Sequence, residues 1–290
     1  KAYELIAKGN VKGLKELATK YGYDMLKKVR FDGYGIGLWN PQNLEKLQEM
    51  INFLVPNIFS DKEMLDIVKS VYHRYIVDGM IDNNSSATFD WVHTTFGDLG
   101  MSPANDYCRY DDNAEDVNKE SYNYCCRFEW LQKSLSNSSL NAANALVRFY
   151  KKFSIGDVLA SIAYAPQPSV KWAIETFKLT REHVLKRPRQ FNTIVTYNRT
   201  LEVVRYLVDA LKLTVEDFMS MNTVKHAIHR QNYVLLYYLH KEVGISAYMI
   251  RVVFDEMLEN QKSIDKASIE SGNVVGVKNE MYDFVSMLIK

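Results

Sequence analysis

Long apolar runs are absent from this chain of 290 residues, and cysteine is scarce. No stretch approaches the ~18 apolar residues that a membrane span needs, so we expect no membrane partner. Residues 1–4 lack the apolar stretch of a secretory signal peptide. The three cysteines are an odd and sparse set, which is typical of a reducing compartment. We therefore expect an intracellular, cytoplasmic protein.

The chain also lacks an excess of either charge. Lysine and arginine total 36, against 35 aspartate and glutamate residues, and the formal net charge is +1. A surface that binds the phosphates of nucleic acid needs a basic surplus on some face, so we expect no nucleic-acid partner. A local basic cluster could meet an acidic partner, although such runs are commonly solvated connectors. Its members are Arg181, His183, Lys186, Arg187 and Arg189.

Motifs that would carry catalysis or cradle a phosphate are missing. The glycines at 33, 35 and 37 lack the spacing and the following Lys-Ser/Thr of a phosphate-binding loop. A nucleophilic thiolate needs a histidine or a helix N-terminus beside it, but no histidine occurs between residues 94 and 182, around Cys125 and Cys126. We expect inert thiols, no enzymatic activity, no cofactor and no small-molecule substrate.

Two patterns resemble metal sites only superficially. The acidic run that starts at Asp111 has Asp116 and Tyr122 where a calcium loop needs a glycine and a bidentate glutamate. His226 and His229 are three residues apart on a predicted helix, but a zinc site needs a third and usually a fourth ligand. We therefore expect surface or packing histidines and no bound metal.

What the chain does contain is repetition. Residues 9–15 read Gly-Asn-Val-Lys-Gly-Leu-Lys, and residues 272–278 read Gly-Asn-Val-Val-Gly-Val-Lys. The clearest copies align Trp172 with Tyr206 and Tyr238, at offsets of 34 and 32 residues. Apolar residues at 203, 204, 207, 208 and 211 form a helical stripe. Such repetition predicts a stacked solenoid, in which each helical unit buries its apolar face against its neighbours.

A shorter helix precedes each stripe, and a turn separates the two. We predict first helices at residues 2–8, 157–164, 193–198 and 224–230. Gly9 and Gly272 suit a left-handed turn, since glycine adopts that geometry without strain. The residues expected to face the neighbouring unit are Ala160, Ile162, Val195, Ala227 and Ile228.

The repeat pattern extends over the whole chain. About eight units result when anchors are placed at residues 16, 49, 91, 130, 172, 206, 238 and 279, with polar insertions near 30–43 and 100–124. We predict a single array over residues 1–290, an all-α, elongated α-solenoid of stacked helix-turn-helix repeats with irregular connectors. Buried positions between units and in the repeat core should include Trp172, Leu207, Leu239, Tyr206 and Tyr238.

The repeats resemble those of the ankyrin family. Residues 9–17 and 201–208 are similar to the turn and second helix of an ankyrin repeat, and residues 213–217 (LTVED) resemble the lengthened ankyrin-like repeats of large DNA viruses and protists. The Thr-Pro-Leu-His that opens the first helix in that family is absent, so short helical or irregular connectors are expected instead of regular hairpin fingers. Other helix-pair solenoids, of the tetratricopeptide or HEAT kind, are the alternative folds.

The resemblance implies a protein–protein interaction module, an adaptor or scaffold, that binds another protein through its concave face and connectors. Tyrosine and arginine are residue types that anchor interfaces. A structural or assembly subunit of a larger complex is an alternative function, and the acidic, tyrosine-rich insertion at 100–124 is a rival binding site. The candidate residues, which precede the turns between helices, are Tyr164, Tyr197, Asn198, His229 and Arg230.

Overall fold

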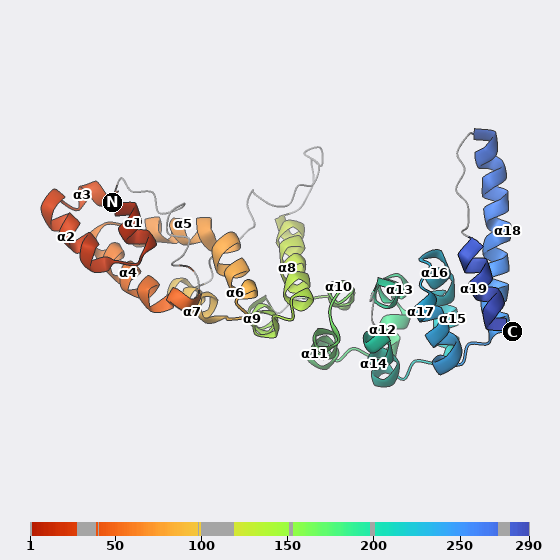
Figure 1. Ribbon diagram of the computed structural model, residues 1–290. Coiled ribbons are helices and arrows are strands. Elements are labelled where there is room, and N and C mark those ends of the chain that lie inside the picture. Colours follow the sequence, from red (N-terminus) through yellow and green to blue (C-terminus); the bar gives the residue numbers. More distant parts are fainter. Residues whose placement is uncertain are drawn as a thin grey trace. The chain divides into compact units, whose positions relative to one another are not determined.

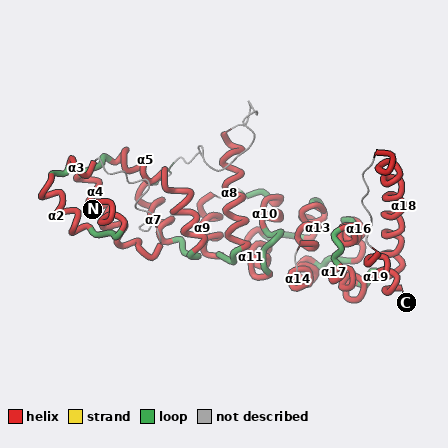
Figure 2. Tube along the Cα trace, turned by 45° about the horizontal axis from the view of Figure 1, so that its top comes forward, coloured by secondary structure: helices red, strands yellow, loops and turns green. Residues whose placement is uncertain are grey.

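The computed structural model describes residues 2–27, 39, 41–97, 99, 119–150, 153–197, 201–271 and 279–289. These residues form helices joined by short turns, and no strand occurs among them (Figure 2). The all-α fold class predicted from the sequence is confirmed. No helix in this described part is both long and apolar enough to cross a membrane. The contacts divide the chain into two compact units, Lys1–Phe153 and Ser154–Lys290.

The first unit is a succession of helices around one core (Figure 1). Residues 61–82 are helical without interruption, and the Ser60 N–H donates to the Glu63 carboxylate at 2.8 Å to cap their start. The elements are α1 (Ala2–Ala7), α2 (Val11–Tyr21), α3 (Asp24–Lys27), the 3-10 turn η2 (Pro41–Asn43), α4 (Leu44–Asn57), α5 (Asp61–Val71), the π-helical η3 (Tyr72–Val77), α6 (Asp78–Asp82), α7 (Ala87–Phe96), α8 (Lys119–Ser136) and α9 (Leu140–Tyr150).

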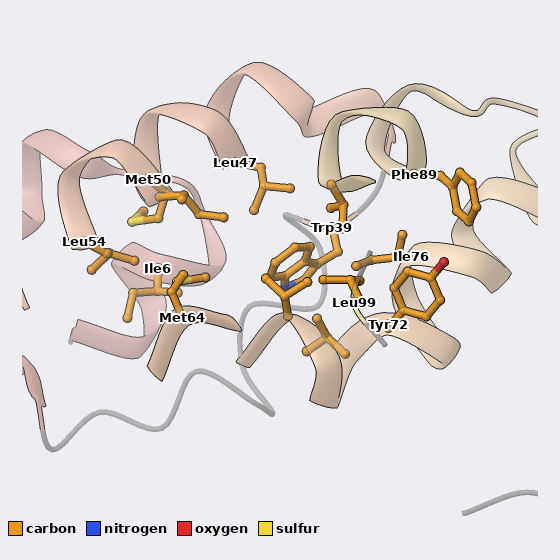
Figure 3. Packing of buried hydrophobic residues seen from close by; sticks show 14 of the residues in the cluster. Ile6, Trp39, Leu47, Met50, Leu54, Met64, Tyr72, Ile76, Phe89 and Leu99 are labelled. Atoms are coloured by element: carbon orange, nitrogen blue, oxygen red, sulfur yellow. The ribbon is translucent and has the colours of Figure 1, made fainter. Parts of the chain in front are cut away.

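The core of the first unit is one continuous cluster of buried apolar side chains. Figure 3 shows Trp39 beside Leu99 and Ile76 in the middle of this cluster. Trp39 is 2% exposed although it lies outside the long helices. Burying aromatic and aliphatic surface is the main favourable contribution to folding. Trp39 and Leu99, which lie between α-helices, are therefore held in the same core as the helices.

The second unit consists of helix pairs in two layers (Figures 1 and 2). Helices α10, α13, α16 and α18 contact one another in that order, as do α11, α14, α17 and α19, while α12 and α15 are short connectors. The bounds are α10 (Ile155–Ser161), α11 (Gln167–Phe177), α12 (Arg181–Leu185), α13 (Pro188–Tyr197), α14 (Leu201–Leu211), α15 (Val215–Ser220), α16 (Thr223–His229), α17 (Tyr233–Tyr238), the π-helical η4 (Leu239–Val243), α18 (Ala247–Ser271) and α19 (Asn279–Ile289).

Four described turns between helices share the same hydrogen bonds, three of them in the first unit and one in the second. Gly9, Asn84, Ser138 and Gln231 have φ between 47° and 66°. Each N–H donates to the carbonyl three residues earlier, and the next residue's N–H donates to the carbonyl five residues earlier, at 2.8–3.2 Å. This is the Schellman arrangement, which satisfies the last carbonyls of the first helix. The predicted left-handed turn is therefore confirmed at Gly9, whereas Gly272 lies outside the described residues.

Most residues predicted to pack between units are buried. Leu207 and Leu239 are 1% and 0% exposed, and Tyr238 is also buried. The small or apolar residues of the first helices are buried too, namely Ile162, Val195, Ala227 and Ile228, while Ala160 is half-buried.

The prediction was wrong for Trp172 and Tyr206, which are only half-buried. Successive helical residues differ by ~100° in direction, so Tyr206 points away from the buried Leu207. Trp172 lies beside buried Ala173 in the same way, and its ring packs edge-on against Phe177 of the same helix, with centroids 5.9 Å apart. Both aromatic rings therefore border the apolar stripe of their helix.

Two further expectations differ from the structure in detail. Trp130 lies in α8, the helix before the turn at Ser138, so α9 and not α8 takes the second-helix position there. Helix α8 begins at Lys119 and covers the last part of the predicted 100–124 insertion, and η2 covers the last three residues of the 30–43 insertion. Most other residues of both insertions lie outside the described ones.

Replacing Leu207 by Ala should destabilise the second unit by ~2–5 kcal/mol, the usual cost of truncating a buried leucine. Urea unfolding followed by circular dichroism measures the change. Glu202→Ala, an exposed position on the same helix, is the matched control and should stay within ~0.5 kcal/mol of the unmodified protein. Equal losses in the two variants would contradict the placement of the stripe.

Candidate functional site

Three of the five candidate residues come from equivalent places in the second unit. Tyr164 follows α10, Tyr197 ends α13 and Arg230 follows α16. Residues 164, 197 and 230 are spaced by 33 positions each time. Because α10, α13 and α16 are packed side by side, equal spacing in sequence becomes adjacency in space. We call Tyr164, Tyr197 and Arg230 the edge ladder.

The edge ladder is a chain of direct side-chain contacts. The rings of Tyr164 and Tyr197 meet edge to face, with centroids 5.4 Å apart and an interplanar angle of 64°. The Arg230 guanidinium carbon lies 4.6 Å from the centroid of the Tyr197 ring, within cation–π distance. Tyr164 and Tyr197 are nevertheless 53% and 39% exposed. The ladder is thus ordered by its own contacts and still accessible.

Buried polar bonds hold the backbone beneath the ladder. The Asn192 amide of α13 donates to the Met221 carbonyl at 2.7 Å, and the Thr223 hydroxyl of α16 donates to the Asn192 side-chain oxygen at 2.7 Å. Nearer the ladder, the Asn232 amide donates to the Thr196 carbonyl at 3.1 Å. Buried polar groups are costly unless such bonds are made, so these bonds fix the register of α13 against α16.

A groove of about 310 Å³ opens beside the ladder, between the end of α13 and the start of α17. Tyr197 and Arg230 are shared between the ladder and the groove. Among the described residues, the lining is a mixture of apolar, aromatic and polar side chains, namely Val195, Thr196, Tyr197, Leu201, Arg230, Gln231, Asn232, Tyr233, Val234 and Leu235.

Helix α16 and the residue after it carry several basic groups. Lys225, His226, His229 and Arg230 are all exposed. Partial burial of the ring lowers the pKa of His226 below its ordinary value, and the positive charges of His229, Arg230 and Lys225 lower it further. His229, a predicted site residue, therefore lies on the helix that ends at the ladder. Asn198, the fifth predicted residue, lies outside the described residues.

The histidines do not assemble into a metal centre in the described part of the chain, which contains no group of three or more His, Cys, Asp or Glu residues placed to hold an ion. His240, on the helical segment that follows α17, has its Nδ1 2.9 Å from the Ile245 carbonyl. A carbonyl only accepts, so Nδ1 carries the proton and donates.

In the first unit, the titratable side chains of Tyr72, His93 and Tyr150 contact one another inside the fold. The Tyr72 hydroxyl lies 2.5 Å from His93 Nε2 and 3.1 Å from the Tyr150 hydroxyl. Tyr72 is fully buried, and the His93 ring packs on Phe149 with centroids 3.7 Å apart. A separate groove of about 520 Å³ between α4, α5 and α7 has Asp61 as the sole charged residue in its described lining.

Sequence reasoning missed the ion pairs between successive helix pairs. Arg181 donates two hydrogen bonds to the buried Asp217, at 2.8 and 2.7 Å, and Arg205 forms a bidentate pair with Glu242. The partners are 36 and 37 residues apart, close to the predicted repeat length, so the offset was a usable signal. Arg181 belonged to the predicted basic cluster, and its charge is neutralised by this pairing.

The Asp217 carboxylate is tuned by this environment. Burial alone raises its pKa, but the hydrogen bonds from Arg181 and the Thr214 N–H and the nearby guanidinium charge outweigh burial, so the pKa lies below its ordinary value. A carboxylate with a depressed folded-state pKa contributes stability that is present above its unfolded pKa of ~3.9 and lost as the pH falls through the folded value.

Replacing Asp217 by Asn should therefore flatten the acid limb of the stability profile. The unmodified protein should lose unfolding free energy below ~pH 5, and the variant should be less stable at neutral pH yet lose less on acidification. Urea unfolding at a series of pH values measures both. Asp157→Asn is the control, because Asp157 caps the Ser154 N–H at 2.9 Å but is paired with no arginine among the described residues. Parallel pH profiles for Asp217→Asn and the unmodified protein would contradict this assignment.

Comparison of the chain with known protein families, with curated proteins and with solved structures finds no match. The ankyrin-like character of residues 9–17 and 201–217 therefore stays a prediction from motifs.

Proposed function

We propose that the chain is a non-enzymatic protein–protein interaction module, an adaptor or scaffold, and that the edge ladder is its partner-binding surface. One observation carries the proposal: three successive helix pairs each place an exposed tyrosine or arginine at the same edge, in mutual contact. Tyrosine and arginine dominate the energetics of protein interfaces, since they combine large contact area with polar tips. A rigid, repeated scaffold reduces the entropic cost of binding through such residues.

We also propose that the helix pairs of both units are repeats of one ankyrin-like type. The same left-handed turn recurs in both units, and the 33-residue spacing of the ladder equals the length of an ankyrin repeat. The short helices α12 and α15 take the place of the hairpin fingers of that family in the described part of the second unit. The chain would then act in the cytoplasm, without nucleic-acid, membrane or cofactor binding.

The test uses a double substitution in the ladder. Once a partner has been captured from extract of the native cells, Tyr197→Ala with Arg230→Ala should weaken its binding by ~1 kcal/mol or more, because both side chains are interface anchors. Titration calorimetry with the captured partner measures the change. Tyr237→Ala is the matched control, since Tyr237 is an exposed tyrosine on α17 outside the ladder.

If the partner binds the 100–124 insertion instead of the ladder, the opposite result is expected. Deleting residues 105–120 should leave binding intact if the ladder is the site. Loss of binding on that deletion, with full affinity retained in the double variant, would move the site to the insertion and leave the ladder as ordinary surface.

An assembly subunit is the second candidate function. Tyr248 is 75% exposed at the start of α18, next to the exposed Met249 and, one turn later, Val252. Clustered exposed apolar residues mark contact surfaces. A concentration-dependent increase in mass in sedimentation, abolished by Tyr248→Ser with Met249→Ser, would favour this function, whereas a monomer at all concentrations favours the free adaptor.

A further inference from the structure

Charge is segregated within the second unit. No aspartate or glutamate occurs between Asp157 and Glu175, between Glu182 and Glu202, or between Asp217 and Glu242. These acid-free stretches contain all of α13 and α16 and the described turns of the edge ladder. Apart from Asp157 in α10, the helices and described turns that carry the ladder therefore contribute basic and neutral side chains.

The basic groups at this edge have no carboxylate partners among the described residues. Elsewhere in the unit, Arg181, Arg205 and Arg251 each pair with an acid, at 2.7 Å for Arg181 and Arg251. Lys225 and Arg230 form no such pair, although Glu256 of α18 lines a small groove of about 110 Å³ together with Lys225. Arg230 is oriented instead by the face of the Tyr197 ring. The pKa of His226 is lowered first by partial burial of its ring and then by the positive charges of His229, Arg230 and Lys225.

The groove supplies an apolar complement to this charge. Tyr197, Val234 and Leu235 contribute to its wall together with Arg230, which directly follows the last turn of α16 with its His226 and His229. Val234 is exposed, so the wall is open to solvent. At about 310 Å³ the groove is at the lower limit of small-ligand sites, which suits one apolar side chain flanked by charged neighbours.

The length of the surface limits what it can hold. Packed helices lie about 8–10 Å apart, so a segment that crosses α10, α13 and α16 spans roughly 20 Å. An extended chain covers ~3.3 Å per residue, and about six residues suffice to cross the ladder.

We propose that the edge ladder binds an extended acidic segment of a partner protein, with carboxylates facing Lys225, His229 and Arg230 and one apolar side chain in the groove beside Tyr197. This inference rests on the proposed function and names the chemistry of the partner. A carboxylate can accept two hydrogen bonds from one guanidinium group. Complementary charge also speeds the association of the two proteins and disfavours basic competitors.

A nucleic acid fits this surface less well. Bases bind to proteins by stacking on free aromatic faces, but the Tyr164 and Tyr197 rings meet edge to face and Arg230 covers a face of Tyr197. The overall charge of the chain is also near balance, at +1, whereas phosphate backbones are bound by a large basic excess.

The test uses defined probes and the full chain. A fluorescein-labelled peptide of about six glutamates around a central phenylalanine is titrated by fluorescence anisotropy, next to the same peptide with glutamine for glutamate and a single-stranded oligonucleotide of equal charge. The acidic peptide should bind at least about tenfold more tightly than its glutamine form, and its affinity should fall as salt screens the charges. Lys225→Glu with Arg230→Glu should abolish this binding and create binding to a lysine form of the peptide.

Two controls keep the outcomes separate. Lys171→Gln with Lys241→Gln removes two exposed charges elsewhere in the unit and should leave binding unchanged, while thermal unfolding confirms that the charge-reversal variant is folded. Equal binding of both peptides, equal losses in the two double variants, or tighter Arg230-dependent binding of the oligonucleotide would each overturn the proposal. A different result separates this inference from the proposed function. If a captured partner needs Tyr197 for binding but the acidic peptide does not bind, the partner's binding segment is not acidic, and the proposed interaction module still stands.

Discussion

Burial of apolar faces between consecutive helix pairs is the constraint on which the rest of the second unit depends. A single pair cannot cover its own stripe, so Val195, Leu207 and Ala227 become buried only because neighbouring pairs stack against them. Stacking fixes the backbone of α10, α13 and α16, and the Asn192 and Thr223 bonds set their register. The ends of these helices are therefore held at constant spacing. Side chains at those ends are not needed for the core, so they can contact a partner.

The sequence predicted the helices better than their individual side chains. The 34- and 32-residue offsets located α11, α14 and α17, because a 3.6-residue apolar period is a strong signal over two or three turns. Trp172 and Tyr206 were misplaced because an aromatic ring one position from the stripe looks apolar in sequence but points about 100° away. Of the four inter-helix turns with the Schellman hydrogen bonds described above, three use Asn, Ser or Gln, so a search for glycine finds only the one at Gly9.

The candidate site could be predicted only in part. Its position before each inter-helix turn followed from the repeat, and Tyr164, Tyr197 and Arg230 do come together. Their mutual contacts, and the groove beside them, depend on how α13 and α17 pack, which no local pattern encodes. In the Arg181–Asp217 and Arg205–Glu242 pairs, by contrast, an arginine and a carboxylate from successive helix pairs neutralise each other. The charges of Arg181 and Arg205 are paired within the unit, whereas the charge of Arg230 at the ladder is available to a partner.

The most direct measurement of the central claim is site-specific photocrosslinking in native cells. A benzoylphenylalanine at position 164 probes the ladder, and the same residue at position 237 probes an equally exposed tyrosine outside it. The account predicts a discrete crosslinked partner protein from position 164 and none from position 237. Crosslinks from position 237 alone would contradict it, because the partner would then bind the face of the second helices and the ladder would be ordinary surface.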